Sequence, residues 1–301
     1  MLDDTVAVLR HFNRTFTPRI GVLDESFLGT GLPFAAARLL FEIGLAPVTV
    51  HELRRRLGAD SGYVSRLLRR LEDDDLIRVA DDPTDGRRRI AALTDAGRLA
   101  WNDLDGRSDE IARRLVDRLT ADQHDQLRDA LTRADRLLRL AAVTLNEVAP
   151  GGAEAMTAMR AYVVELDQRF PERFDIGTGF DDDEIAQMTG PSGTFIVVAD
   201  RHASDDGTSV LGCGGLRRLD DTTAEIKRMW VHPSMRGLGL GRQLLDRLEI
   251  AARQLGYQSV ALDTHATLDS AIAMYETAGY LRVDRYNDNP YAHLFFRREL
   301  S

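Results

Sequence analysis

The sequence predicts a two-domain protein whose first domain is all-α with one β-hairpin and whose second domain is α/β. Three observations predict this fold class. The chain has 301 residues, about twice the length of an average domain. Apolar residues recur at helical spacing through most of the first half, whereas short β-rich runs alternate with helical patterns in the second. Pro150-Gly151-Gly152 is a helix-breaking cluster typical of a domain junction. We therefore expect domains over residues 1–148 and 153–301.

Composition limits the function classes. Hydrophobic residues make up 44% and charged residues 29% of the chain, a mixture typical of globular proteins. No run approaches the ~18 apolar residues of a membrane-spanning helix. Asp3 and Asp4 stand where a secretory signal has positive charge, so we expect a cytoplasmic protein without membrane contacts. Cys213 is the single cysteine, which excludes a multi-cysteine metal site. The 7 histidines show no ligand-like pairing, and no metal is predicted.

Two short helices joined by a glycine turn are predicted in the first half. Thr49, with a glutamate three residues later, is typical of a capping box and starts a helix over residues 49–57 that ends before Gly58. Asp60 or Ser61 can cap the second helix. The buried stripe of this helix comprises Val64, Leu67, Leu68 and Leu71. Its opposite face is polar and basic, as in a helix-turn-helix whose second helix enters the major groove. On other proteins such a face is usually only solvated.

A β-hairpin is predicted directly after these helices. Its strands span residues 76–79 and 88–93, and the turn between them is rich in Asp, Pro and Gly. The formal net charge is −9, so DNA binding has to rest on where the arginines lie rather than on overall charge. Arginines occupy positions 87–89 beside this turn. A hairpin of this kind next to a helix-turn-helix predicts a DNA-binding wing.

The segment from about residue 5 to 145 resembles the MarR family of winged-helix regulators. The wing motif Asp-Pro-x-Asp-x-Arg of that family is present as Asp82-Pro83-Thr84-Asp85-Gly86-Arg87, and Asp95-Ala96-Gly97 follows the second strand. The resemblance implies a homodimer built from the first helix and the last two, bound to a pseudo-palindromic double-stranded DNA operator. It implies that Arg87 reaches the minor groove or the backbone, where the negative potential suits arginine. The residues that it places against bases or phosphates are Ser61, Tyr63, Ser65, Arg66 and Arg69.

A glycine-rich segment lies between a predicted strand and a predicted helix in the second half. It reads Val231-His232-Pro233-Ser234-Met235-Arg236-Gly237-Leu238-Gly239-Leu240-Gly241-Arg242. Glycines let the backbone approach a ligand, and amides at a helix start bind anions, so the segment predicts a phosphate or pyrophosphate site. A Walker loop is excluded because no Gly-Lys-Ser/Thr follows. A Rossmann loop is disfavoured because Leu244 stands at the third glycine position.

The pattern Arg236-x-x-Gly239-x-Gly241 resembles the acetyl-CoA loop of GNAT acetyltransferases. The resemblance covers roughly residues 155–299 and includes Ala273-Met274-Tyr275-Glu276-x-x-Gly279-Tyr280. It implies an α/β fold with a central mixed sheet and an N-acetyltransferase that uses acetyl-CoA as co-substrate. The residues that it implies bind this co-substrate are Met229, Trp230, Val231, Arg236, Gly237, Leu238, Gly239, Leu240, Gly241 and Arg242.

Acetyl transfer to an alkylammonium acceptor requires a base, because the ammonium pKa is near ~10.4. The resemblance implies Glu225 in this role; the alternative is a surface or salt-bridged strand residue, paired with Lys227. It implies that Tyr275 protonates the departing thiolate; the alternative is a core aromatic. A main-chain amide near Met229 or Trp230 is implied as the oxyanion donor.

Together these features predict a transcriptional regulator that is also an acetyl-CoA-dependent N-acetyltransferase. The expected reaction is direct attack of a primary amine on the thioester, and this amine belongs to a small molecule or to a protein lysine. Two alternatives stay open. In the first, the second domain senses acetyl-CoA or another ligand with little turnover. In the second, the winged helix of an enzyme serves only for dimerisation.

Overall fold

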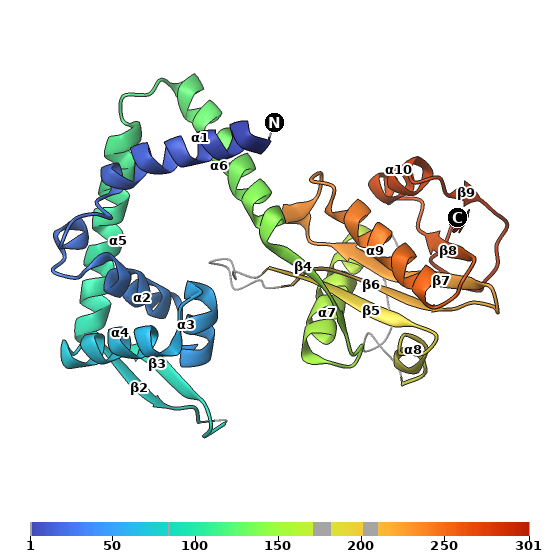
Figure 1. Cartoon of the computed structure of the whole chain (residues 1–301), viewed down its shortest axis with the longest axis horizontal. Helices are drawn as coiled ribbons and strands as arrows, with labels where there is room; N and C mark the ends of the chain where they lie inside the picture. The colour runs from blue at the N-terminus through green and yellow to red at the C-terminus, as the bar shows by residue number, and fades with distance from the viewer. Residues whose placement is uncertain (1, 84, 171–181, 201–209, 301) are drawn as a thin grey trace. The chain divides into compact units, whose positions relative to one another are not determined.

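The computed structural model describes residues 2–83, 85–170, 182–200 and 210–300. It divides into two compact units, Met1–Leu131 and Thr132–Ser301, and most of their helices and strands are labelled in Figure 1. Each unit has its own hydrophobic core. One helix, α6 (Ala121–Ala142), contains the division and so contributes residues to both units.

The first unit is built mainly from helices. Besides the first part of α6, they are α1 (Leu2–Phe16), α2 (Phe34–Leu45), α3 (Val50–Leu57), α4 (Ser61–Asp73) and α5 (Asp95–Val116), with 3-10 turns at Thr17–Ile20 and Phe27–Gly29. Over the described residues its antiparallel sheet has the order β1-β3-β2, from β1 (Val48–Thr49), β2 (Ile77–Asp81) and β3 (Arg89–Leu93). The core lies between α2 and its neighbours and includes the fully buried Leu39, Leu40, Ile43, Leu53 and Leu71.

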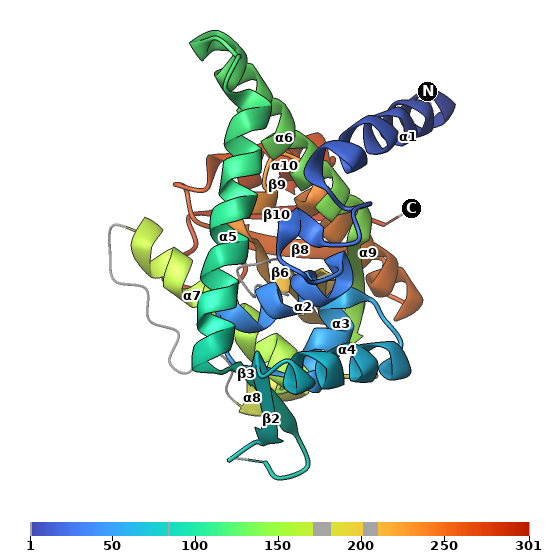
Figure 2. The same cartoon turned by 90° about the vertical axis from the view of Figure 1, so that its left-hand side faces the viewer.

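The helix-turn-helix forms where the sequence predicts it. The Thr49 hydroxyl accepts a hydrogen bond from the Glu52 amide at 3.1 Å, and Gly58 ends α3 in the left-handed conformation with φ 58°. Asp60, one of the two predicted caps, accepts from the Tyr63 amide at 3.0 Å and starts α4. Strands β2 and β3 form the predicted hairpin, which projects beside α4 (Figure 2).

The second unit is an α/β structure around one mixed sheet. Its helices are α7 (Ala153–Arg169), α8 (Asp182–Gln187), α9 (Leu240–Gln254) and α10 (Asp269–Thr277), with a 3-10 turn at Pro233–Met235. Its strands are β4 (Val143–Val148), β5 (Thr194–Asp200), β6 (Val210–Arg218), β7 (Thr223–Val231), β8 (Ser259–Thr264), β9 (Leu281–Arg282) and β10 (Leu294–Glu299). In the described part of the chain their order is β4-β5-β6-β7-β8-β10-β9, and β7 with β8 is the parallel pair.

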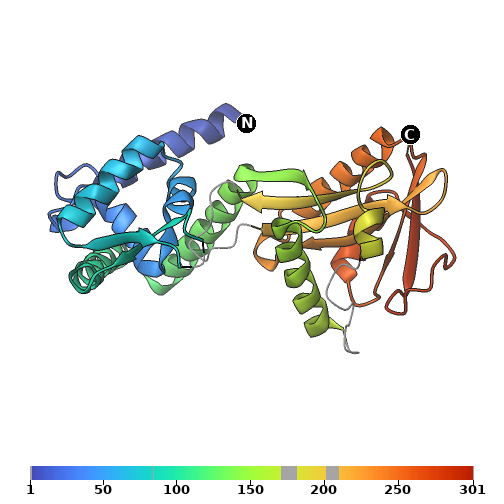
Figure 3. The ribbon, with the colours of Figure 1, turned by 90° about the horizontal axis from the view of Figure 1, so that it is seen from below.

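Helices cover both faces of this sheet (Figure 3). Side chains alternate between the faces of a strand. Along β5, Ile196 and Val198 pack with the apolar stripe of α9, whereas Phe195 and Val197 pack with α7. Helix α9 lies close to β6 at Gly214. A Cβ at this position would lie only 2.8 Å from a methyl carbon of Leu248, so the absence of a side chain allows the close packing.

The division between the units falls earlier than the sequence predicts. The sequence predicts a first domain that extends to residue 148, but residues 143–148 form β4, which pairs with β5 in the second unit. The sequence conceals this strand because it follows α6 without a glycine or proline to mark the change. The breaker cluster at residues 150–152 instead forms the turn between β4 and α7.

Candidate active site and DNA-binding surface

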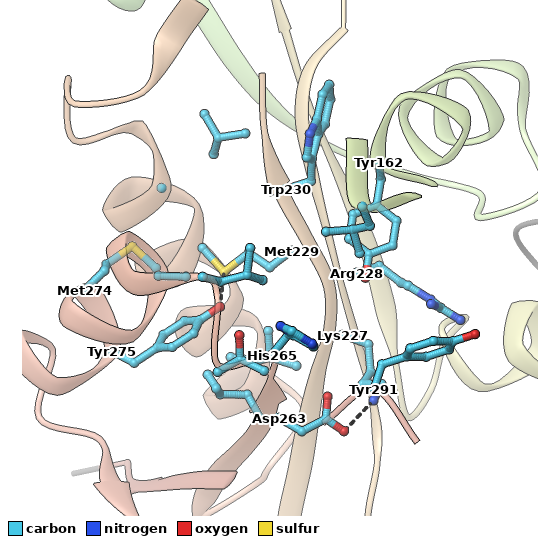
Figure 4. A pocket seen from close by; sticks show the side chains of 18 of the residues that line it. Tyr162, Lys227, Arg228, Met229, Trp230, Asp263, His265, Met274, Tyr275 and Tyr291 are labelled. Carbon is cyan, nitrogen blue, oxygen red and sulfur yellow. Dashed lines mark hydrogen bonds and ion pairs between the residues drawn. The ribbon is translucent and has the colours of Figure 1, made fainter. Parts of the chain in front are cut away.

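A cavity opens where two parallel strands separate. Pairing between β7 and β8 runs from Thr223 opposite Ser259 to Ile226 opposite Leu262, and within the described strands it ends there. The cavity has a volume of about 1040 Å³ and is lined by residues from α7, α8, both strands, the start of α9 and α10 (Figure 4). This volume is large enough for a cofactor-sized ligand.

Strand β7 is distorted just where it leaves β8. Its register with β6 shifts between Cys213 and Gly215, and Arg228 has φ 56°, in the left-handed region that costs an L residue roughly 1–2 kcal/mol. The Arg228 guanidinium donates two hydrogen bonds of 2.9 Å to the Glu184 carboxylate on α8. The buried Cys213 thiol donates to the Arg228 carbonyl at 3.3 Å. Burial raises the pKa of this thiol, so it stays protonated and is no nucleophile.

The start of α9 meets the physical requirements of an anion site. Gly237 and Gly239 have φ of 75° and 83°, and a Cβ at either would meet no described atom within 4 Å. Gly239 is the N-cap of this 15-residue helix; among the described residues no side chain caps it, and its first turn holds no acidic residue. The first-turn amides therefore stay available as donors at the positive end of the helix dipole. These residues fit a phosphate or diphosphate.

Two charged side chains far away in the sequence hold this loop in place. Arg136, in the last turns of α6, donates from Nε to the Ser234 carbonyl at 2.8 Å and from Nη2 to the Arg236 carbonyl. Glu165 on α7 pairs with the Arg236 guanidinium and accepts from Trp230 Nε1 at 2.8 Å. Sequence analysis missed Arg136 and Glu165, since both lie 65 to 100 residues from their partners and no local pattern marks them.

Tyr275 on α10 faces β7 across the cavity. Its hydroxyl donates to the Met229 sulfur at 3.8 Å, and its ring packs beside Tyr280 and Phe296. Burial raises the pKa of the Tyr275 phenol above its ordinary value. The hydroxyl therefore keeps its proton at neutral pH and can donate it to a group that enters between β7 and α10.

Glu225 lies beneath the cavity rather than on its wall. It is fully buried and is absent from the described residues that line the cavity. Its carboxylate accepts from Arg217 Nε at 2.7 Å and from Asn287 Nδ2 at 2.9 Å, and lies 3.6 Å from the Lys227 ammonium. This placement agrees with the alternative interpretation of Glu225, a strand residue held by ion pairs.

Asp263, at the separating end of β8, is a carboxylate that does line the cavity. It accepts from Lys227 Nζ at 2.8 Å, from Asn287 Nδ2 at 2.6 Å and from Asn289 Nδ2 at 3.3 Å. Burial alone would raise the pKa of Asp263, but the Lys227 ammonium and these hydrogen bonds outweigh it and hold the pKa below its usual range. Asp263 is thus ionised at neutral pH, a role that the sequence did not indicate.

The polar face of α4 and the tip of the wing form a second candidate surface. The apolar stripe of α4 is buried, which leaves the predicted contact residues on the other side. Arg66 lies over the Tyr63 ring, with its guanidinium carbon 5.9 Å from the ring centroid. At the wing tip the Asp85 carboxylate accepts from the Arg87 amide at 3.1 Å and shapes the turn; Thr84 of the motif lies outside the described residues. Ser65 is half-buried, and the exposed members of the predicted set are Ser61, Tyr63, Arg66, Arg69 and Arg87.

Comparison with known proteins identifies the second unit. The model of the acetyltransferase (GNAT) family matches residues 160–280. An uncharacterised N-acetyltransferase of Schizosaccharomyces pombe is 32% identical over 140 residues, which cover 44% of this chain and 83% of the relative. The chain belongs to the GNAT family. An IAA acetyltransferase of Azospirillum brasilense is 37% identical to this GNAT protein over 109 residues, 36% of the chain and 66% of the relative.

The first unit of the GNAT protein has a match of its own. The MarR family model matches residues 30–88, so the chain is a fusion of a MarR-family region with a GNAT domain. A solved MarR-family regulator from Rhodococcus sp. RHA1 has 23% identity and a TM-score of 0.36, covering 44% of this chain and 93% of its own. A solved acetyltransferase from Streptococcus agalactiae has 22% identity and a TM-score of 0.43, and the match covers 53% of this chain and 99% of the acetyltransferase. The predicted fold class, a winged helix-turn-helix followed by a GNAT fold with a mixed sheet, is confirmed.

The structure brings most of the predicted co-substrate residues of the GNAT domain to one cavity. All of them line it except Leu238, whose side chain packs on the core around α9. Tyr275 joins them from α10, whereas Glu225 does not. In the described ranges we find no group of three or more His, Cys, Asp or Glu side chains that could hold a metal ion, and no helix long and apolar enough to cross a membrane.

Proposed function

We propose that this GNAT protein is a DNA-binding regulator that also transfers the acetyl group of acetyl-CoA to a primary amine by direct attack. The observation that carries the proposal is the continuous cavity that joins the start of α9, Tyr275 and Asp263 between two separated strands. An anion site, a proton donor and a carboxylate in one cavity are the groups that acyl transfer from a nucleotide thioester to an amine needs.

The residues on the α9 side fit acetyl-CoA, which supplies the activated thioester. The amides from Gly237 to Gly241 would hold its diphosphate, on a loop that Arg136 and Glu165 already fix. The bulge at Arg228 turns the backbone of Met229 and Trp230 next to the opening. A main-chain amide there would stabilise the oxyanion, because a preorganised donor costs no reorganisation during the reaction.

The residues on the other side fit a cationic acceptor. Ionised Asp263 attracts an ammonium group, which must lose a proton before its nitrogen attacks. In this proposal the proton passes to the Asp263 carboxylate, directly or through water in the cavity. In this proposal Glu225 acts indirectly, by fixing the position of Asn287. The Asn287 amide donates to both the Glu225 and the Asp263 carboxylates. Glu225 would therefore orient the site without touching the substrate.

Tyr275→Phe should lower kcat by about 10²-fold, the usual contribution of a general acid, while the Kd for acetyl-CoA changes less than twofold. The loss arises because the thiolate of CoA would leave without a proton. Because burial raises the pKa of Tyr275, the ratio of wild-type to variant rates should stay constant up to pH 10, where a phenol of ordinary pKa would be half ionised. Stopped-flow measurement of thiol release checks both points. Equal rates in the two proteins would remove Tyr275 from the mechanism.

The burial of Glu225 favours one second candidate, a GNAT domain that binds acetyl-CoA as a signal with little turnover. A thiol-release assay with amino acids, polyamines, aminoglycosides and lysine peptides separates the two functions. The enzyme requires amine-dependent release well above the rate without acceptor. The sensor requires calorimetric binding of acetyl-CoA with no acceptor-dependent release.

The regulatory half of the proposal rests on the first unit. Helix α1 has no buried residue, and Val6, Leu9, Phe12 and Phe16 form an exposed apolar face along it. A second copy of the chain would cover this face, and two copies would place two α4 helices and two wings on one operator. We therefore propose a homodimer that binds double-stranded DNA.

We further propose that acetyl-CoA and the operator influence each other through α6. This helix begins in the first unit, and its Arg136 holds two carbonyls of the loop in the second. Arg136→Ala should weaken acetyl-CoA binding by about tenfold, as expected for the loss of hydrogen bonds to a charged group. It should also remove most of the change in operator affinity that acetyl-CoA causes.

Operator affinity measured by fluorescence anisotropy, with and without acetyl-CoA, checks this coupling. Arg133→Ala is the matched control, since Arg133 is an exposed arginine one turn earlier on α6. If acetyl-CoA leaves the operator affinity of the wild-type protein unchanged, the two sites are independent.

A further inference from the structure

The side chain of Arg228, rather than its backbone, needs an explanation. Within the described residues of the second unit, Arg228 is the one non-glycine residue with positive φ. Glycine adopts this conformation freely, so a bulge alone would be served better by glycine. Strained residues of this kind cluster at active sites and ligand-binding sites.

The Arg228 guanidinium lies in the part of the cavity away from Tyr275 and the α9 loop. Figure 4 shows it on the opposite side of β7 from Tyr275, near Tyr162 and Tyr291. Its carbon lies 6.0 Å from the centroid of the Tyr162 ring, and its side chain is only 15% exposed. Residues of α7, of α8 and of the Asn287–Tyr291 segment line the cavity together with Arg228.

The present partner of Arg228 has the chemistry of a ligand group. Glu184 accepts from Nε and Nη2 through its two oxygens, both at 2.9 Å, the paired geometry by which arginine recognises a free carboxylate. The other cations that line this part of the cavity have partners of their own: Lys227 is held by Asp263, Arg169 by Glu165, and Arg217 by Glu225 and by Gln187 on α8. The end of the cavity thus combines a carboxylate receptor, two tyrosine rings and, at Asp263, a site for an ammonium.

We propose that the acceptor is an amine that also carries a carboxylate, of the amino-acid class, and that its carboxylate binds Arg228 in place of Glu184. This inference rests on the proposed acetyltransferase function. Exchange of one carboxylate for another leaves Arg228 paired throughout, so the exchange avoids the cost of a bare buried cation. The displaced Glu184 carboxylate, on the short helix α8 at the wall of the cavity, would turn into water. The amino group would then lie toward Asp263 and the opening between β7 and β8.

The test compares acceptors that differ in the carboxylate alone, such as L-leucine with 3-methylbutylamine and L-phenylalanine with phenethylamine. For the full-length wild-type protein, kcat/KM should favour the amino acid of each pair. Arg228→Gly removes the guanidinium and leaves a residue that accepts φ 56° without strain. It should lower the ratio of the two kcat/KM values at least tenfold. Asp75→Gly, a position with the same φ in the first unit, is the control and should leave the ratio unchanged.

Glu184→Gln separates this role from a merely structural one. If Glu184 competes with the substrate, its loss should lower KM for the amino acids severalfold and leave the matched amines unaffected. If the Glu184–Arg228 pair only braces the bulge, both variants should impair the two acceptor classes alike. That result, or a wild-type ratio near one, overturns the inference and leaves the proposed function standing.

Absence of turnover with every acceptor would contradict the proposed function itself. The inference is then decided by binding, measured as the shift in melting temperature with CoA present. N-acetyl-L-leucine should stabilise the wild-type protein more than N-(3-methylbutyl)acetamide does, and Arg228→Gly should remove the difference. Equal shifts in the wild-type protein would overturn the carboxylate receptor.

Discussion

Gly239→Asp should abolish acetyl-CoA binding while the chain stays folded. Gly239 has φ 83°, a conformation that aspartate tolerates better than most residues. The new carboxylate would lie at the N-cap of α9 and accept hydrogen bonds from the first-turn amides, the groups that we assign to the diphosphate. It would also repel the diphosphate charge. We expect an increase in Kd of more than 100-fold by calorimetry.

Gly256→Asp is the matched control for this variant. Gly256 also has a positive φ, 89°, and a Cβ there would meet no described atom within 4 Å. It lies beyond the far end of α9 and does not line the cavity. The control therefore carries the same backbone strain without the competing carboxylate, and its acetyl-CoA affinity should equal that of the wild-type protein. A Gly239→Asp protein that binds acetyl-CoA within tenfold of wild type would exclude the α9 loop as the diphosphate site.

Arg87→Ala should abolish operator binding at physiological salt while the winged helix stays intact. Arg87 is exposed at the wing tip and its side chain has no place in the core, so its loss costs little stability. A dimer loses two such contacts to phosphate or to the minor groove, which weakens binding to all DNA sequences alike. At low salt, where weak binding is measurable, the dependence of log K on log salt should become shallower.

Arg160→Ala provides the control for non-specific charge loss. Arg160 is an exposed arginine on α7 that bonds to Thr157 Oγ1 on its own helix. It changes the net charge by the same amount in the unit that does not contain α4 and the wing. Gel shifts with the protein's own promoter region compare the two variants. A retained shift for Arg87→Ala at physiological salt would contradict a role of the wing in DNA binding.

The elements that could be predicted from the sequence are those with a local physical signature. Thr49 and Asp60 are caps that satisfy nearby amides, and Gly58 ends α3 because it accepts a left-handed conformation. The anion site at the α9 loop could likewise be predicted, because its glycines and the helix that follows are contiguous in the sequence. In each case the residues that make the structure lie within about one turn of one another.

The site residues that could not be predicted depend on partners that only the fold brings together. Arg136 and Glu165 support the loop across 65 to 100 residues, and the Glu184–Arg228 pair spans 44. Glu225 shows the reverse limit. Its position on the strand matches a family pattern, but its buried carboxylate lies behind Arg217 and Asn287, which bond to it and themselves line the cavity.

Lys227 is the one lysine in the sequence, and it lies 12% exposed between the Asp263 and Glu225 carboxylates. The protein surface therefore offers no lysine amine that its own acetyl donor could modify. Lys227 lines the cavity, so a small amine-reactive reagent can reach its ammonium through the cavity, whereas a lysine-specific protease requires the strand around it to open. A ligand that fills the cavity should therefore slow labelling of this single lysine, which then reports occupancy of the cavity without any engineered probe.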